Sequence, residues 1–171
     1  MEEAGYIFEV VESHVDENIS GECAYCVETL AKRKAKAVSQ QMTGEAMVIA
    51  ADTLVSINGR ILEKPANEAD AFEMLDLLQG QMHTVFTGVA ISHSGGMISF
   101  AESTNVYFRS LTAAEINAYI KTGEPFDKAG AYGIQGKGAN LVKRIEGCFY
   151  AVMGLPMARL ANEIKFLIAK K

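Results

Sequence analysis

The sequence has few cysteines, fewer basic than acidic residues and no long hydrophobic run. No apolar stretch approaches the roughly 20 residues that span a bilayer, so we expect no membrane-spanning segment. Three cysteines, an odd number, fit a reducing cytoplasm better than a disulfide framework. The first residues, Met1-Glu2-Glu3-Ala4, lack a signal-peptide pattern. A net charge of −5 argues against a nucleic-acid-binding face. We therefore expect a cytoplasmic protein that binds neither membranes nor nucleic acids.

The composition is that of an ordinary globular protein. With 171 residues, 49% of them hydrophobic and 22% charged, the chain suits a single domain over residues 1–171. Its three histidines have no metal-binding spacing, and no serine elbow or Cys/His pair indicates covalent catalysis. Cys23 and Cys26 have C-x-x-C spacing on a predicted helix, but no second pair completes a zinc site. We interpret them as packing cysteines.

Hydrophobic periodicity and capping residues predict alternating strands and helices. Helix boundaries are indicated by Asn67 with Asp70, by Thr112 with Glu115, and by Pro156 at the start of the last helix. Strands are expected over residues 6–11, 47–55, 82–92, 97–109 and 141–152, and helices over residues 22–41, 68–79, 112–121 and from 156 onward.

The stretch from Met47 to Val55 organises the chain, because this apolar run is interrupted by Asp52. Burying an unpaired charge is costly, so we expect Asp52 at the end of a strand, where ligands of α/β sheets bind. Asn58-Gly59 then predicts a tight turn, which brings Glu63 and Lys64 back before the rigid Pro65. These residues either form one pocket for a metal and a phosphate or are a capped strand end with a solvated turn.

Two other stretches are open to two interpretations. Lys34 lies along the apolar side of its predicted helix, so it either reaches the rim with its ammonium group or contacts an anion in a cleft. The glycine-rich segment over residues 123–138 carries Asp127, Lys128, Tyr132 and Gln135. Glycines allow close approach of the backbone to a ligand. On spacing alone, however, this segment is a flexible connector.

The order of several motifs resembles one family over nearly the whole chain. These motifs are T-L-A-x-x-K-A from Thr29, A-A-D-T-x-V from Ala50, L-E-K-P from Leu62, G-x-x-H-x-V-x-T-G-V-A-I from Gly80, T-G-E-P-x-D-K-A-G-A-Y-G-I-Q-G from Thr122 and G-L-P from Gly154. Together they resemble the Maf family of septum-formation-inhibitor-like nucleoside triphosphate pyrophosphatases. The resemblance implies an α/β fold of the Maf/ITPase type, with a mixed twisted sheet flanked by helices in two lobes. It also implies a homodimer.

The A-Y-G-I-Q-G motif resembles the branch that hydrolyses dTTP and UTP to the monophosphate and pyrophosphate. The resemblance implies that Asp52, Lys64 and Gln135 are catalytic and that Lys34, Thr53 and Lys128 bind substrate. Glu17 and Asp52 are the candidate ligands of a divalent metal, Mg²⁺ or Mn²⁺, because hard cations prefer carboxylate oxygens. Asp52 could instead deprotonate the attacking water. The residues do not separate these two roles.

One feature of the family has no counterpart in these 171 residues. Family members open with a strand and an S-x-S-P-R-R loop that grips phosphate, whereas here Met1 to Gly5 stand where the family leaves its first helix. Two explanations compete, a truncated form of an active enzyme and a genuine short form with weaker triphosphate binding. A non-catalytic nucleotide-binding or regulatory protein is therefore the alternative to an enzyme.

Overall fold

A five-stranded sheet forms the centre of the molecule. A computed structural model describes residues 1, 4–44 and 46–169. The strand order is β2-β1-β3-β4-β5, and the four pairs of neighbouring strands are antiparallel. The expectation of a mixed sheet is therefore wrong, because the described strands include no parallel pair. The strands are β1 (Val48–Ile57), β2 (Arg60–Leu62), β3 (Met82–His93), β4 (Gly96–Phe108) and β5 (Val142–Glu146). The expected α/β fold with a sheet flanked by helices is confirmed.

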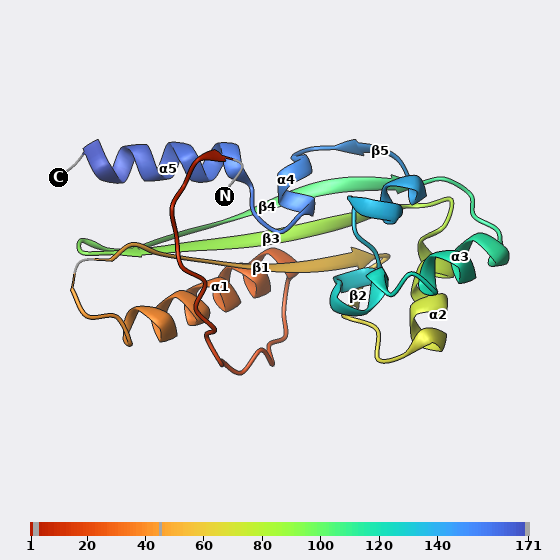
Figure 1. The fold of residues 1–171 in the computed structure, drawn as a ribbon, viewed down its shortest axis with the longest axis horizontal. Helices are drawn as coiled ribbons and strands as arrows, with labels where there is room; N and C mark the ends of the chain where they lie inside the picture. The colour runs from red at the N-terminus through yellow and green to blue at the C-terminus, as the bar shows by residue number, and fades with distance from the viewer. Residues whose placement is uncertain (2–3, 45, 170–171) are drawn as a thin grey trace.

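Two long helices cover opposite faces of the sheet at one end. Helix α1 (Cys23–Ser39) lies on one face and α5 (Met157–Ala169) on the other (Figure 1). Side chains alternate between the two faces of a strand, so on β3 Ala90 packs with Ala31 of α1, and Ile91 packs with Leu160 of α5. We call this end the α1/α5 lobe.

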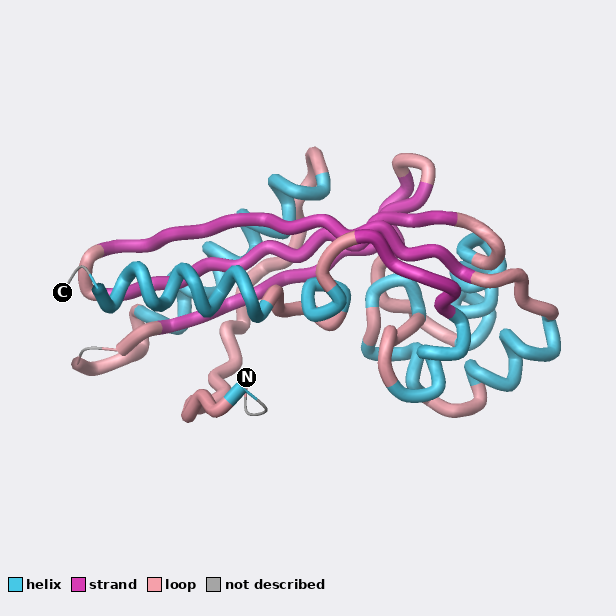
Figure 2. Tube along the Cα trace, turned by 90° about the horizontal axis from the view of Figure 1, so that it is seen from above, coloured by secondary structure: helices cyan, strands magenta, loops and turns pink. Residues whose placement is uncertain are grey.

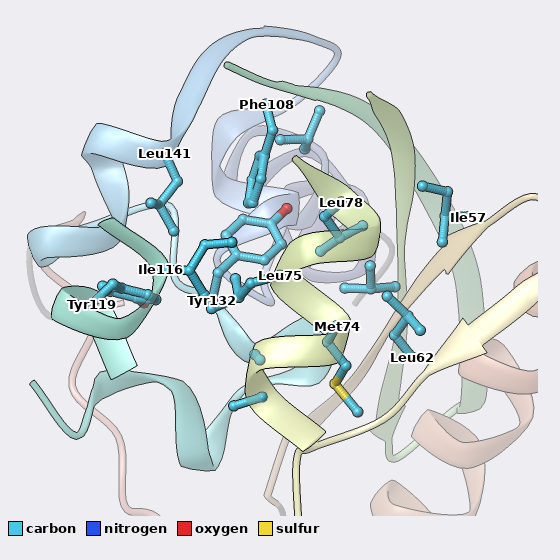
Figure 3. Close-up of a cluster of buried hydrophobic side chains, with 14 of the residues drawn as sticks. Ile57, Leu62, Met74, Leu75, Leu78, Phe108, Ile116, Tyr119, Tyr132 and Leu141 are labelled. Carbon is cyan, nitrogen blue, oxygen red and sulfur yellow. The ribbon is translucent and has the colours of Figure 1, made fainter. Parts of the chain in front are cut away.

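The other end of the sheet carries a second hydrophobic core. It is built around α2 (Glu68–Leu78) and α3 (Ala113–Ile120), with Leu75, Leu78, Ile116 and Tyr132 packed together (Figure 3). Three short 3-10 helices, η2 (Glu124–Asp127), η3 (Ala129–Ala131) and η4 (Gly136–Leu141), belong to this α2/α3 lobe. Seen from above, the molecule is elongated and its long strands run from one lobe to the other (Figure 2). The two-lobed expectation is confirmed.

The predicted local signals are found where the sequence places them. Asn58 and Gly59 have φ values of 50° and 79°, which form the tight turn of the β1–β2 hairpin. Thr112 and Glu115 make a reciprocal capping box at the start of α3. The Asn67 side chain accepts a hydrogen bond from the backbone N–H of Asp70 at the start of α2.

Strand β2 covers the outer edge of β1 along only a short distance. Its register pairs Val55 with Leu62 and Ile57 with Arg60. Along the described residues of this sheet, the outer edge of β1 from Val48 to Leu54 therefore has no strand beside it. Asp52 is in this part of β1, paired with Gly88 of β3. The expectation that Asp52 ends a strand is wrong, because the strand continues to Ile57.

Two strand predictions need correction. Residues 6–11 form no strand, and Ile7 and Val10 are exposed; β-branched composition alone does not make a strand where no neighbour supplies hydrogen bonds. The strand expected over residues 141–152 is shorter, because Gly147 adopts a φ of 132° after β5 and α4 (Phe149–Val152) follows. Among the described residues, no helix is both long and apolar enough to cross a membrane.

Candidate active site

A cavity of about 740 Å³ lies beside the outer edge of β1, with walls from both lobes. Nucleotide-sized ligands occupy pockets of roughly 300–1,000 Å³. All seven residues singled out in the sequence line this central cavity: Glu17, Lys34, Asp52, Thr53, Lys64, Lys128 and Gln135. Asp52, Glu63 and Lys64 all line this one cavity, which favours the pocket interpretation of that stretch over a capped strand end with a solvated turn.

Close packing of α1 on the sheet brings Lys34 to Asp52. Gly88, the cross-strand partner of Asp52, faces the backbone of Val27 on α1. A Cβ atom at Gly88 would lie 2.3 Å from the Val27 carbonyl oxygen, so only glycine allows this approach. Lys34 lies two turns further along the same helix and points toward β1.

The ammonium group of Lys34 bridges two carboxylates. Its Nζ lies 2.7 Å from Oδ1 of Asp52 and 2.7 Å from Oε1 of Glu17. The Asp52 side chain is 10% exposed and that of Lys34 is 18% exposed, whereas that of Glu17 is 58% exposed. Lys34 and Asp52 thus form a largely desolvated ion pair, to which Glu17 adds a second carboxylate from the solvent side. The anion that Lys34 contacts in this structure is a pair of protein carboxylates.

Burial and ion pairing act in opposite directions on this pair. Burial raises the pKa of the Asp52 carboxyl above its ordinary value; Lys34 opposes the rise, and the nearby charge of Glu17 adds to it. Burial by itself lowers the pKa of Lys34, but its hydrogen bonds to Asp52 and Glu17 outweigh this and hold the pKa above its ordinary value. Lys34 is therefore a permanent cation at neutral pH, and Asp52 has the raised basicity that suits a general base.

The loop that carries Glu17 is held by Arg33, a residue that the sequence reasoning missed. The Nη1 group of Arg33 donates hydrogen bonds to the carbonyl oxygen of Asp16 at 3.3 Å and to that of Asn18 at 3.2 Å. These carbonyls flank Glu17 on both sides. Arg33 and Lys34 are adjacent on α1. The same helix turn therefore positions the loop that carries Glu17 and the Lys34 ammonium group that the Glu17 carboxylate contacts.

Lys64 lines the cavity from the segment that follows β2. It follows β2 and precedes the buried Pro65, and the carbonyl of Glu63 accepts a hydrogen bond from Gly130 N–H at 3.0 Å. This contact joins the segment to the glycine-rich loop. Within the described residues Lys64 makes no ion pair, and its charge lowers the pKa of Asp52 and Asp127 as a minor contribution. It is the cation best placed to meet an added anion.

The glycine-rich segment of the α2/α3 lobe presents Gln135 at the cavity, whereas the ammonium group of Lys128 is already hydrogen-bonded within the segment. Lys128 Nζ donates to Asp127 Oδ1 at 2.6 Å and to the Glu124 carbonyl at 3.1 Å. The Glu124 carboxylate accepts hydrogen bonds from the backbone N–H groups of Lys137 and Gly138, which holds the turn after Gln135. Gln135 itself is exposed. The segment is thus a held loop and not a flexible connector.

A buried aromatic cluster anchors this loop to the sheet, and the sequence reasoning assigned it no role. His83 Nε2 and the Tyr132 hydroxyl are 2.7 Å apart, and both rings pack edge-to-face with Phe108. Burial lowers the pKa of His83 to about 4, so its ring is neutral at pH 7. Tyr132 also lines the central cavity. The contacts of Tyr132 with His83 and Phe108 therefore hold one part of the cavity wall in place.

Thr53 belongs to a chain of hydroxyl groups that the sequence did not indicate. Thr53 Oγ1 lies 2.9 Å from Thr87 Oγ1, and the Thr87 hydroxyl donates to the Ala151 carbonyl at 2.7 Å. Thr53 and Thr87 are cross-strand partners on β1 and β3. The one sequence signal for Thr87 is the alternation in the G-x-x-H-x-V-x-T motif, which puts His83, Val85 and Thr87 on the same face of a strand.

The carboxylates of the cavity fit a divalent cation in part. Across the residues that the structure describes, no cluster of three or more His, Cys, Asp or Glu side chains could hold a metal ion. Glu17 and Asp52 nevertheless converge on one cation, the Lys34 ammonium. Mg²⁺ typically needs only one or two protein carboxylates, since phosphates and water complete its shell. The donor set therefore fits a metal that arrives with a phosphorylated substrate.

The cysteines play no visible part in this chemistry. Cys23, Cys26 and Cys148 are free thiols. Burial raises the pKa of the Cys26 thiol, which keeps it protonated and inert. This agrees with the interpretation of Cys26 as a packing residue.

Comparison with known proteins identifies the family. A family model described as "Maf-like protein" matches residues 1–167. A dTTP/UTP pyrophosphatase of Bacillus cereus strain ATCC 10987 is 48% identical over 167 residues, which cover 96% of this chain and 82% of that protein. Proteins of the same name from Bacillus anthracis and Bacillus cytotoxicus are 47% and 49% identical, with 96% of this chain and 87% of each relative covered. The chain therefore belongs to the Maf family.

Proposed function

We propose that this protein is a nucleoside triphosphate pyrophosphatase that hydrolyses dTTP and UTP to the monophosphate and pyrophosphate. The observation that carries the proposal is the largely desolvated Lys34–Asp52 pair in a nucleotide-sized cavity. It stands in a chain that is about 48% identical to a protein named dTTP/UTP pyrophosphatase. In the reaction, water adds to phosphorus, the α–β phosphoanhydride bond breaks, and pyrophosphate leaves.

The roles follow from the charges around the cavity. Asp52 takes the proton of the attacking water, a task that its raised pKa suits, or it holds a metal through its carboxylate oxygens. Lys34 and Lys64 stabilise the negative charge that shifts onto the phosphates in the transition state. Gln135 orients the nucleotide or the water, and Lys128 adds positive charge at the rim while it is paired with Asp127.

A divalent metal, Mg²⁺ or Mn²⁺, completes the proposal. Glu17 and Asp52 would hold it, since both carboxylates already contact one cation, Lys34. When bound, such a metal neutralises phosphate charge and lowers the pKa of its bound water. With Glu17 and Asp52 engaged by a metal, Lys34 would be free to pair with the phosphates, because an ammonium group and a metal ion repel each other at the same carboxylates.

The test is pyrophosphate release from dTTP, UTP, CTP and GTP with Mg²⁺ or Mn²⁺, measured on the wild type and on Asp52→Asn. We expect release from dTTP and UTP, and a loss in kcat/KM of about 10²- to 10⁴-fold in the variant, the usual contribution of a general base. Asp76→Asn is the matched control, because Asp76 is an exposed carboxylate on α2 outside the cavity.

Three outcomes distinguish the alternatives. Release that vanishes only in Asp52→Asn supports the enzyme. Binding of dTTP by calorimetry with no release from any nucleotide supports the non-catalytic nucleotide-binding protein. Equal release by the wild type and Asp52→Asn contradicts the roles given to Asp52.

The cellular form is a further part of the proposal. We propose a single-domain cytoplasmic protein that acts as a homodimer. The three free cysteines support a reducing compartment. Sedimentation velocity measures the oligomeric state, and a monomer at micromolar concentration would contradict the dimer.

A further inference from the structure

The central cavity has walls of two chemical kinds. Glu17, Lys34, Asp52 and Lys64, together with the paired Asp127 and Lys128, belong to its charged lining, and we call Thr53, Val152, Met153 and Gly154 the uncharged wall. Asp52 and Thr53 are neighbours on β1, so their side chains point to opposite faces of the strand. A nucleotide has the same division, because its phosphates carry charge and its nucleoside does not. The uncharged wall is therefore the side that fits the nucleoside.

The hydroxyl chain of this wall has a fixed direction. The Ala151 carbonyl can only accept, so the single proton of Thr87 is used in the 2.7 Å contact with it. Thr87 must then accept in its 2.9 Å contact with Thr53, and Thr53 must donate its own proton to Thr87. Thr87 is 0% exposed, so no water competes for these bonds. What remains at the Thr53 oxygen is acceptor capacity alone.

We propose that Thr53 accepts a hydrogen bond from the nucleoside of the substrate, and that buried Thr87 is the positioning residue that makes Thr53 an acceptor. This inference rests on the proposed function. Phosphate oxygens are acceptors at neutral pH and do not match such a group. The matching donors on dTTP are the N3–H of the thymine ring and the 3′-hydroxyl of the sugar. Thr53 thus selects the nucleoside and does not grip phosphate.

The space beside Thr53 is kept open for such a contact. A Cβ atom built on Gly154 would lie 3.5 Å from Thr53 Oγ1, and Gly154 adopts a φ of 101° that side chains rarely adopt. A larger residue here would cover the hydroxyl oxygen. If the donor is N3–H, the same acceptor also disfavours cytosine, whose N3 is itself an acceptor. Two acceptors that face each other leave both unpaired.

The experiment compares dTTP with two analogues that each lack one donor. N3-methyl-dTTP removes the ring N–H, and 2′,3′-dideoxy-TTP removes the sugar hydroxyl, so the two arms distinguish the sources. We expect one analogue to lose about 10- to 100-fold in kcat/KM with the wild type, because the bound analogue covers the Thr53 oxygen and leaves this acceptor unpaired. Dissociation constants by calorimetry provide the same comparison without turnover.

Variants then separate the hydrogen bond from steric effects. Thr87→Val frees the Thr53 proton, so the penalty for the analogue should shrink to a few-fold, and in Thr53→Val it should disappear. Thr87→Ser keeps a hydroxyl and should retain the wild-type penalty. Thr84→Val is the matched control. Thr84 lies on β3 like Thr87, but its hydroxyl donates a hydrogen bond to Asn105 and it does not line the cavity. A steric clash of the methyl group would persist in every variant.

The outcomes judge the two proposals separately. The inference is overturned if the wild type treats both analogues like dTTP, or if Thr87→Val keeps the full penalty. Binding of dTTP without pyrophosphate release overturns the proposed function, while the ratio of dissociation constants still decides the role of Thr53. If no nucleotide binds to the folded protein, both proposals fail.

Discussion

One cation lies between two carboxylates at the centre of the candidate site. Lys34 lies 2.7 Å from both Asp52 and Glu17, and burial raises the pKa of Asp52 while Lys34 opposes that rise. The net direction is upward, so the carboxylate of Asp52 protonates at a higher pH than an ordinary aspartate. An activity that needs ionised Asp52 is therefore lost as the pH falls through this raised pKa.

Lys34→Met should move the acid limb of activity to higher pH. Without the ammonium group, burial and Glu17 both raise the pKa of Asp52, and only the minor effect of Lys64 still opposes them. The measurement is kcat/KM for dTTP as a function of pH, on the activity that remains after the loss of the charge proposed to stabilise the phosphates. Lys32→Met is the control, because Lys32 is exposed on the same helix, pairs with Glu28 and does not line the cavity. An acid limb that stays in place or moves to lower pH contradicts this account.

At the scale of elements, the backbone of α1 packs directly on β3 at Gly88, next to Asp52. Gly88 removes the one side chain that would separate the helix from the strand next to Asp52. Small residues continue this contact, since Ala31 and Ala35 of α1 pack on Ala90 of β3. The distance between helix and sheet therefore decides whether Lys34 reaches Asp52.

Gly88→Ala should destabilise the protein and impair catalysis together. The new Cβ would lie 2.3 Å from backbone atoms of Val27, so α1 must shift, and overpacking of this kind costs about 1–3 kcal/mol. Because Lys34 moves with the helix, kcat for dTTP should fall as well. Urea unfolding and pyrophosphate release measure the two effects.

Gly95→Ala is the matched control for this substitution. A Cβ at Gly95 would meet only the His93 side chain, which lies at the hairpin turn and can move. We expect a change in unfolding free energy below about 0.5 kcal/mol. A Gly88→Ala protein as stable and as active as this control would show that α1 tolerates the displacement.

At the scale of the whole molecule, one sheet joins two hydrophobic cores. Leu160 and Val89 belong to the core of the α1/α5 lobe, and Leu75 and Val85 to that of the α2/α3 lobe. Strand β3 contributes to both cores within five residues of chain, from Val85 to Val89. The cavity takes its walls from both lobes, so the relative position of the lobes determines its shape.

Because continuous strands join the cores, the two lobes should unfold in one transition. Leu75→Ala and Leu160→Ala each empty a site of 0% exposure in a different lobe and should cost about 2–5 kcal/mol. Both should lower the midpoint of the same urea transition, observed by circular dichroism and by tyrosine fluorescence. Two separate transitions, each sensitive to one variant, would contradict the coupling.

The sequence by itself determined the local structure of this protein. The Asn58-Gly59 turn and the Thr112–Glu115 capping box depend on hydrogen bonds and dihedral angles within a few residues, so the sequence predicts them directly. The order of the motifs also indicated which side chains gather in the central cavity. It did so through the resemblance to a family, because spacing alone left each stretch open to a second interpretation.

The tertiary structure decided how these groups act on one another. Lys34 and Asp52 are 18 residues apart, Thr53 and Thr87 are 34 apart, and Thr87 and Ala151 are 64 apart. Contacts over such separations depend on register and on helix-to-sheet packing, which no local pattern encodes. For the same reason residues 6–11 have the composition of a strand without forming one, while Asp52, expected at a strand end, lies within β1.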